Sequence, residues 1–135
     1  MKKQPPANLQ PEEFCPIRQT IRLLGKHWTI LIIKELYYTP KKKLGFMDLR
    51  RRLPDASSKV LSQRLKEMVK NDLLKRKVHS KKMPIRVSYR LTDKGEDACK
   101  IIEDLKEYGI KWGGRETFDC SEINCELCRR LREQQ

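Results

Sequence analysis

The sequence predicts a mainly α-helical fold with one small β-hairpin, an α+β class. Two patterns predict it. Between residues 57 and 71, Leu61, Leu65 and Met68 recur at helical spacing and give one apolar face. Residues 86–91 alternate between polar and apolar side chains, which is typical of a half-buried strand.

The segment 54–91 joins these two patterns in a recognisable order. Ser57 and Ser58 are good helix N-caps, because a hydroxyl can accept from an N–H group that has no helical partner. The helix is expected to end near Asn71. Two strands follow, at 75–79 and 85–91, and the basic loop 80–84 joins them. A helix followed by such a hairpin is the second half of a winged helix-turn-helix.

The other helices and the domain organisation follow from caps and breakers. Cys15-Pro16 opens a first helix that Gly25 ends, since Pro is favoured at the first helical position. Further helices are predicted at 27–38, 46–53 and 93–112, with a basic loop at 39–45. We therefore expect a flexible arm over 1–14, one domain over 15–112, and a cysteine-bearing tail over 113–135.

The positive charge of the chain lies in one contiguous region. The 135 residues include 31 Lys and Arg against 18 Asp and Glu, a net charge of +13. Residues 40–90 hold 17 of the basic and 4 of the acidic side chains, so the remainder is neutral. A polyanion is the expected partner, because each neutralised phosphate releases counterions and adds affinity. A plain solubility surface would normally mix the two signs.

Three groups of side chains are candidates for contact with double-stranded DNA. Short polar and basic residues on an exposed helix suit the major groove, where Gln can pair with adenine and Lys with guanine or phosphate. An arginine run beside that helix and a basic hairpin loop are placed for phosphate contact. The candidates are Ser58, Lys59, Ser62, Gln63 and Lys66 on the helix, Arg50 and Arg51 before it, and Lys81, Lys82 and Arg86 in the hairpin.

Several classes of protein are disfavoured by the sequence. No apolar run reaches the roughly 18–20 residues that span a bilayer, and the N-terminus lacks the apolar stretch of a signal peptide. We therefore expect a cytoplasmic protein with no membrane partner. It is not expected to be an enzyme, because there is no Gly-rich phosphate loop, no pair of carboxylates in a predicted cleft, and only two histidines.

Cys15 is a candidate redox-sensing residue. As the N-cap of the first helix it lies at the positive end of the helix dipole, with Arg18 one turn further on. Both features favour the thiolate, which is the nucleophilic and oxidisable form. The alternative is a small buried hydrophobic side chain, and the local sequence favours neither interpretation over the other.

The tail carries a second group of cysteines, Cys120-x4-Cys125-x2-Cys128. A thiol–disulfide switch between Cys125 and Cys128 is one interpretation. Zinc or an iron–sulfur cluster held by Cys120, Cys125 and Cys128 is another, because thiolates are ligands for both. A third is that these thiols have no role.

The first and last predicted helices carry more apolar surface than a small domain can cover. Ile17 and Ile21 share one face of the first helix. The last helix has a continuous stripe from Ala98 to Trp112. These helices are the candidate elements of a homodimer, which would match a two-fold operator with half-sites about 34 Å apart.

Several motifs in this order resemble the HxlR-type family of transcriptional regulators, which is related to MarR-type regulators. They are Cys15-Pro16, Gly25-Lys26-x-Trp28, Phe46-x-x-Leu49-Arg50, Leu53-Pro54, Ser58-Lys-Val-Leu61-Ser-Gln-Arg-Leu65 and Tyr89-Arg-Leu-Thr-x-x-Gly95. The resemblance implies a homodimer formed by the first and last helices, a fourth helix in the major groove, and a wing at the minor groove. It also implies that Cys15 senses oxidants, quinones or aldehydes, as the matching cysteine does in several members.

Two functional hypotheses follow. The first is a sequence-specific DNA-binding transcriptional regulator that cysteine oxidation or a small electrophile modulates. The alternative is a regulatory protein that binds zinc or an iron–sulfur cluster through the tail cysteines, with the winged helix as a scaffold or as a module that docks RNA or protein.

Overall fold

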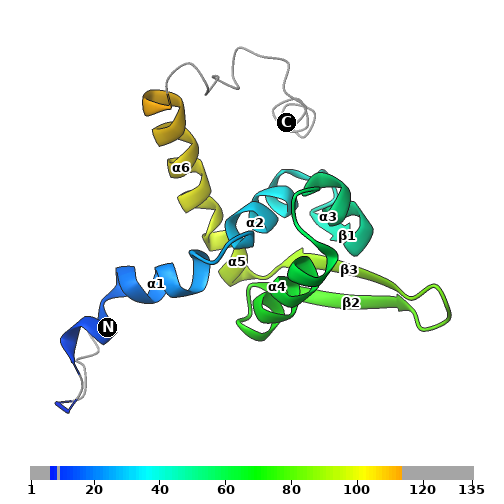
Figure 1. Ribbon diagram of the computed structural model, residues 1–135, viewed down its shortest axis with the longest axis horizontal. Coiled ribbons are helices and arrows are strands. Elements are labelled where there is room, and N and C mark those ends of the chain that lie inside the picture. Colours follow the sequence, from blue (N-terminus) through cyan, green and yellow to red (C-terminus); the bar gives the residue numbers. More distant parts are fainter. Residues whose placement is uncertain (1–6, 9, 114–135) are drawn as a thin grey trace.

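The computed structural model describes residues 7–8 and 10–113 and confirms the predicted class (Figure 1). A short helical domain carries a three-stranded antiparallel sheet, and α1 and α6 extend away from it. The elements, in chain order, are η1 (Pro11–Phe14), α1 (Pro16–Leu24), α2 (Thr29–Tyr38), β1 (Lys43–Gly45), α3 (Phe46–Arg52), α4 (Ser58–Lys70), β2 (Leu74–Ser80), β3 (Arg86–Leu91), α5 (Asp93–Asp97) and α6 (Cys99–Trp112). The 3-10 helix η1 lies within the segment that was predicted to be a flexible arm.

The sheet has one more strand than the predicted hairpin. Its order is β1-β3-β2, with β3 antiparallel to both neighbours. The prediction of a loop over 39–45 is therefore wrong for residues 43–45. Leu44 explains the strand, because it is buried and lies opposite Tyr89 of β3, so that pairing brings an apolar side chain into the core.

Helix α2 is the central helix of the domain, as its apolar sequence predicts. Ile32, Ile33 and Leu36 are fully buried. Leu61, Leu65 and Met68 of α4, Leu49 of α3, and Tyr89 and Leu91 of β3 belong to the same core cluster. Burial of these side chains, at about 25 cal/mol per Å² of apolar surface, fixes α4 and the sheet relative to one another.

Helix α2 begins at Thr29 and not at His27, because the backbone turns sharply before it. Trp28 has a φ of 78°, a left-handed conformation that is strained for a bulky side chain. The His27 ring stacks on the Trp28 indole with 4.3 Å between the ring centroids. The turn 25–28 therefore has a defined shape.

The predicted continuous helix 93–112 is in fact two helices, α5 and α6, which meet at Ala98. The Thr92 hydroxyl caps α5, accepting from the Gly95 N–H at 3.0 Å. Gly95 packs so closely on Leu73, the residue before β2, that an added Cβ would lie 2.3 Å from the Leu73 carbonyl oxygen. The first turn is thus fixed on the sheet, and the chain bends at Ala98 before α6 leaves the domain (Figure 1).

Helices α1 and α6 expose the apolar faces that their sequences predict. Ile17 and Ile21 of α1 are 69% and 61% exposed, and Tyr108 and Trp112 of α6 are 69% and 66% exposed. Over residues 7–8 and 10–113, none of the helices combines the length and the apolar character that crossing a bilayer requires.

Candidate nucleic-acid interface

Helix α4 presents the side chains that the sequence predicts for DNA contact. The Ser57 hydroxyl accepts from the Val60 N–H at 3.1 Å and starts the helix. Ser58, Lys59, Gln63 and Lys66 are exposed, and Ser62 is half-buried. Because Leu61, Leu65 and Met68 are buried on the other side, these polar side chains form the outward face of α4.

The two α3 arginines that the sequence predicts for DNA contact, Arg50 and Arg51, differ in whether they have an ion-pair partner. Arg50 is exposed and has no salt bridge among the described residues. Arg51 is paired with Asp48, whose other carboxylate oxygen accepts from the Gly45 N–H at 3.1 Å. Arg51 can therefore reach a phosphate only by leaving its partner.

The wing is the turn between β2 and β3 with the strand ends beside it. Lys81, Lys82 and Arg86 are all exposed, and Figure 1 shows the turn projecting from the end of the hairpin. A hollow of about 420 Å³ lies between α4 and the hairpin, and it is lined by Ser62 and Lys66 of α4 and by Arg76 of β2. Arg76, which the sequence reasoning did not single out, therefore extends the basic surface of α4 onto β2.

A small ionic network ties α4 to the turn before α2. The Arg64 guanidinium donates from Nε to the His27 carbonyl oxygen at 2.9 Å and from one terminal nitrogen to Glu67 at 2.6 Å. The Lys26 ammonium lies 3.2 Å from the same carboxylate oxygen. The hydrogen bond from Lys26 is the main cause that lowers the pKa of Glu67; burial opposes it, and the charges of Arg64 and Lys26 act in the lowering direction.

Cys15 is the N-cap of α1, as predicted, and is half-buried. Its thiol makes no capping hydrogen bond. The backbone N–H groups of Arg18 and Ile17 nevertheless lower the pKa of Cys15, the Arg18 charge acts in the same direction, and partial burial opposes both. The first turn of α1 thus favours the thiolate, the reactive form.

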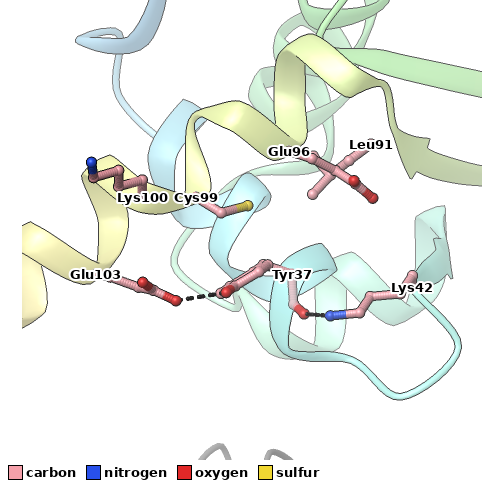
Figure 2. Close-up of a pocket in the computed structure, with 7 residues that line it drawn as sticks. All are labelled: Tyr37, Lys42, Leu91, Glu96, Cys99, Lys100 and Glu103. Carbon is pink, nitrogen blue, oxygen red and sulfur yellow. Dashed lines mark hydrogen bonds between the residues drawn. The ribbon is translucent and has the colours of Figure 1, made fainter.

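Cys99, unlike Cys15, is buried in surroundings that disfavour the thiolate. It lies at the start of α6 above Tyr37 of α2, beside a hollow of about 540 Å³ (Figure 2). Burial, with the nearby charge of Glu96, raises the pKa of Cys99 to about 11. The Tyr37 hydroxyl donates to Glu103 at 2.6 Å, and this bond, with burial, raises the pKa of Tyr37 to about 12.

The predicted metal and disulfide sites of the tail, Cys120, Cys125 and Cys128, lie outside the described residues. Within residues 7–8 and 10–113, no three His, Cys, Asp or Glu side chains are grouped so that they could hold a metal ion. Cys15 and Cys99 are both free thiols.

Comparison with known proteins supports the same architecture. The sequence model of one protein family, described as HxlR-like helix-turn-helix, matches residues 23–117. YvaP of Bacillus subtilis strain 168, an HTH-type transcriptional regulator, is 31% identical over 105 residues, which are 77% of this chain and 94% of YvaP.

Two solved structures share the fold. A transcriptional regulator of the MarR family from Porphyromonas gingivalis W83 superposes with a TM-score of 0.68 at 30% identity, over 77% of this chain and 98% of that one. The redox regulator HypR in its oxidised form superposes with a TM-score of 0.61 at 27% identity, over 72% of this chain and 96% of HypR.

Proposed function

Because the chain belongs to the HxlR-like helix-turn-helix family and is a transcriptional regulator of the HxlR/MarR type, we propose that it binds operator DNA as a homodimer and that modification of Cys15 modulates the binding. In this proposal α4 enters the major groove and the wing meets the neighbouring backbone. The supporting observation is the outward face of α4, where exposed polar and basic side chains lie opposite a fully buried apolar face.

The side chains have different roles in this proposal. Gln63 and Ser62 are short enough to contact base edges, and Lys59 and Lys66 can reach guanine or phosphate. Arg50, Lys81, Lys82 and Arg86 hold the backbone and set the position of α4, without reading sequence themselves. Arg51 joins them only when its pair with Asp48 opens.

The DNA-binding part of the proposal is tested by selecting bound duplexes from fragmented genomic DNA with the full chain. A recurrent motif with two-fold symmetry is expected. Recovery of fragments without any shared motif, or preference for structured RNA in a direct competition, would contradict the proposal. The selection is run on reduced protein first, so that cysteine chemistry does not enter the result.

The homodimer is supported by the unpartnered apolar faces of α1 and α6. Apolar side chains this exposed and this close in sequence are costly in a monomer, and burying them against a second copy removes that cost. Tyr108→Asp on α6 should shift the protein toward monomer in sedimentation velocity, whereas Glu107→Gln beside it should not. A wild-type protein that remains monomeric at micromolar concentration would exclude this part of the proposal.

The proposed modulation begins at the Cys15 thiolate. Its sulfur would bond to an electrophilic carbon of a quinone, whose ring takes up the displaced electron pair and then a proton. Cys15 lies at one end of α1, and the other end runs into the turn 25–28 that Arg64 and Lys26 tie to α4. A displacement of α1 therefore has a direct route to the DNA-reading helix.

This modulation is tested by operator binding with and without a quinone, in wild type and in Cys15→Ser. Wild type should change its affinity by about tenfold or more, and the variant should not respond. An equal response of both proteins would remove Cys15 from the mechanism. A third protein with Cys120, Cys125 and Cys128 all changed to Ser separates any contribution of the tail.

A further inference from the structure

The sheet has a second basic surface on the side that faces away from α4. Tyr89 of β3 is buried and lines the hollow beside α4, so its side chain lies on the inner face, and Arg76 is its cross-strand partner on β2. Side chains alternate between faces along a strand, so their sequence neighbours lie on the opposite face. We call this the outer sheet face, formed by Lys43, Lys75, Lys77, His79, Ser88 and Arg90; Arg76 lines the hollow on this face as well as the one beside α4.

Three cations form one row across all three strands of this face. Lys43 of β1 lies opposite Arg90 of β3, which lies opposite Lys75 of β2. Neighbouring strands are about 4.8 Å apart, and like charges placed directly opposite destabilise a sheet. All three side chains are exposed, and none has an ion pair or hydrogen bond with another described residue. The row thus carries a repulsion that no described acidic group offsets.

The shape and chemistry of the face suit a phosphate backbone. It forms a hollow of about 360 Å³, which is also lined by Lys77 and by His79 and Ser88, whose side chains are hydrogen-bonded 2.7 Å apart. Lys75 and Lys77 are two residues apart on one strand, hence about 6.7 Å, which is similar to the spacing of successive phosphates. No Phe, Tyr or Trp side chain lines the hollow, so it lacks the large aromatic rings on which the bases of a single strand stack.

We infer that the outer sheet face binds the phosphate backbone of the operator duplex beyond the segment that α4 and the wing contact. This inference rests on the proposed DNA binding and extends it. Helix α4 packs on the inner side of the sheet, and the outer sheet face is on the opposite side. With α4 in the major groove of a half-site, the outer sheet face is therefore directed toward the DNA that flanks this half-site. Flanking DNA that leans toward the protein would meet the row of Lys43, Arg90 and Lys75.

The test compares two duplexes that share one operator, obtained by the selection described above. The minimal duplex ends at the outer edge of each half-site, and the extended duplex adds about one helical turn at both ends. Wild-type protein should bind the extended duplex about tenfold more tightly than the minimal one. Its dependence on salt should also be steeper, by about 0.9 in log–log slope for each added phosphate contact.

The double variant Lys75→Gln/Arg90→Gln should bind the minimal duplex as wild type does and lose the gain from the flanks. A matched control, Lys94→Gln/Lys100→Gln on α5 and α6, removes the same charge and should keep that gain. If Lys75→Gln/Arg90→Gln still bound the extended duplex more tightly than the minimal one, the inference would be overturned. If this variant had in addition lost the binding of poly-glutamate, the outer sheet face would bind an acidic protein segment and not DNA. Equal loss on both duplexes, with an unchanged urea midpoint, would overturn it too.

Failure of the inference and failure of the proposed function are distinct results. If wild-type protein selects no operator, the proposed function has failed and the two duplexes cannot be made. If wild type selects an operator and binds the two duplexes equally, only the role of the outer sheet face is refuted.

Discussion

Arg64 of α4 donates to the backbone carbonyl of His27, and the two residues, 37 positions apart in the chain, are joined at 2.9 Å. His27 lies in the strained turn that connects α1 to α2, and Trp28 beside it has a positive φ. The same guanidinium holds Glu67, which Lys26 of that turn also contacts. The position of α4 is therefore tied to the connection between α1 and the core.

Arg64→Met removes both bonds and keeps most of the aliphatic stem. We expect a loss of about 1–2 kcal/mol in the free energy of unfolding, because Arg64 is only 16% exposed and both bonds involve a charged donor. Urea denaturation measures it. Lys66→Met is the control. Because Lys66 is exposed, this substitution should lower the free energy of unfolding by less than about 0.5 kcal/mol, although it should weaken DNA binding. Equal unfolding midpoints for the two variants would contradict the role of Arg64.

The lowered pKa of Glu67 predicts a pH-dependent difference between wild type and Glu67→Gln. A depressed pKa in the folded state means that the carboxylate stabilises the protein above its ordinary pKa, and that this stabilisation is lost as pH falls through the lower folded value. Wild type should therefore be the more stable protein at pH 7, and the gap should close in acid. Urea titrations at pH 7 and below pH 4, at low salt, measure it. A gap of the same size at both pH values would contradict the prediction.

Substitutions of Gln63 and of Lys81 should change DNA binding in different ways if α4 contacts bases and the wing contacts phosphate. Gln63→Ala is expected to relax base preference at one operator position by about 1–3 kcal/mol. Lys81→Ala should weaken binding to every sequence by a similar factor and make the salt dependence shallower. Affinities for operator and random duplexes over a range of salt measure both effects. Equal loss of operator and random binding for Gln63→Ala would argue against α4 as the reader.

The two described cysteines should differ strongly in reactivity. In a background with Cys120, Cys125 and Cys128 changed to Ser, iodoacetamide at pH 7 should alkylate Cys15 first. The N–H groups of Arg18 and Ile17 favour its thiolate, whereas burial raises the pKa of Cys99 to about 11. Intact-mass measurements over time, with Cys15→Ser and Cys99→Ser as references, follow each site. Faster labelling of Cys99 would contradict this assignment.

Two glycines of the last helical region should respond oppositely to alanine. Gly95→Ala places a Cβ 2.3 Å from the Leu73 carbonyl oxygen, so the backbone must move and the free energy of unfolding should fall by more than about 1 kcal/mol. Gly109→Ala meets nothing within 4 Å and should stabilise α6 by up to about 1 kcal/mol. Thermal and urea unfolding compare the pair. Equal effects would mean that the contact of Gly95 with Leu73 does not fix α5.

The parts of the fold that follow local rules were predictable. Ser57 and Thr92 cap the helices that their positions predict, and the alternation in residues 86–91 marks β3. Strand β1 was missed because three residues are too short to show a period, and only Tyr89 opposite Leu44 makes the strand favourable. The break at Ala98 was missed because the apolar stripe continues through it, so the helical spacing does not mark the point where α5 ends and α6 begins.

The side chains of the candidate site could be predicted from the sequence, but the hydrogen bonds and ion pairs that tie α4 to the rest of the domain could not. Exposed polar residues on α4 follow from helical spacing alone. Arg64 and Glu67 are three residues apart and have the spacing of an ordinary helix pair, so the sequence did not indicate that His27 and Lys26 complete the network. The outer sheet face was missed because its row requires β1, and the register of β1 with β3 is a property of the folded sheet.

Because the chain bends at Ala98, a small change of angle at this residue moves the far end of α6 relative to the DNA-binding domain. The 14 residues of α6 span about 20 Å, so a change of about 10° at the bend moves the far end by about 3–4 Å. That distance is about one base-pair step along a duplex. In the proposed dimer, the packing of Gly95 on Leu73 would therefore help to decide which operator spacings the two subunits can bridge at once.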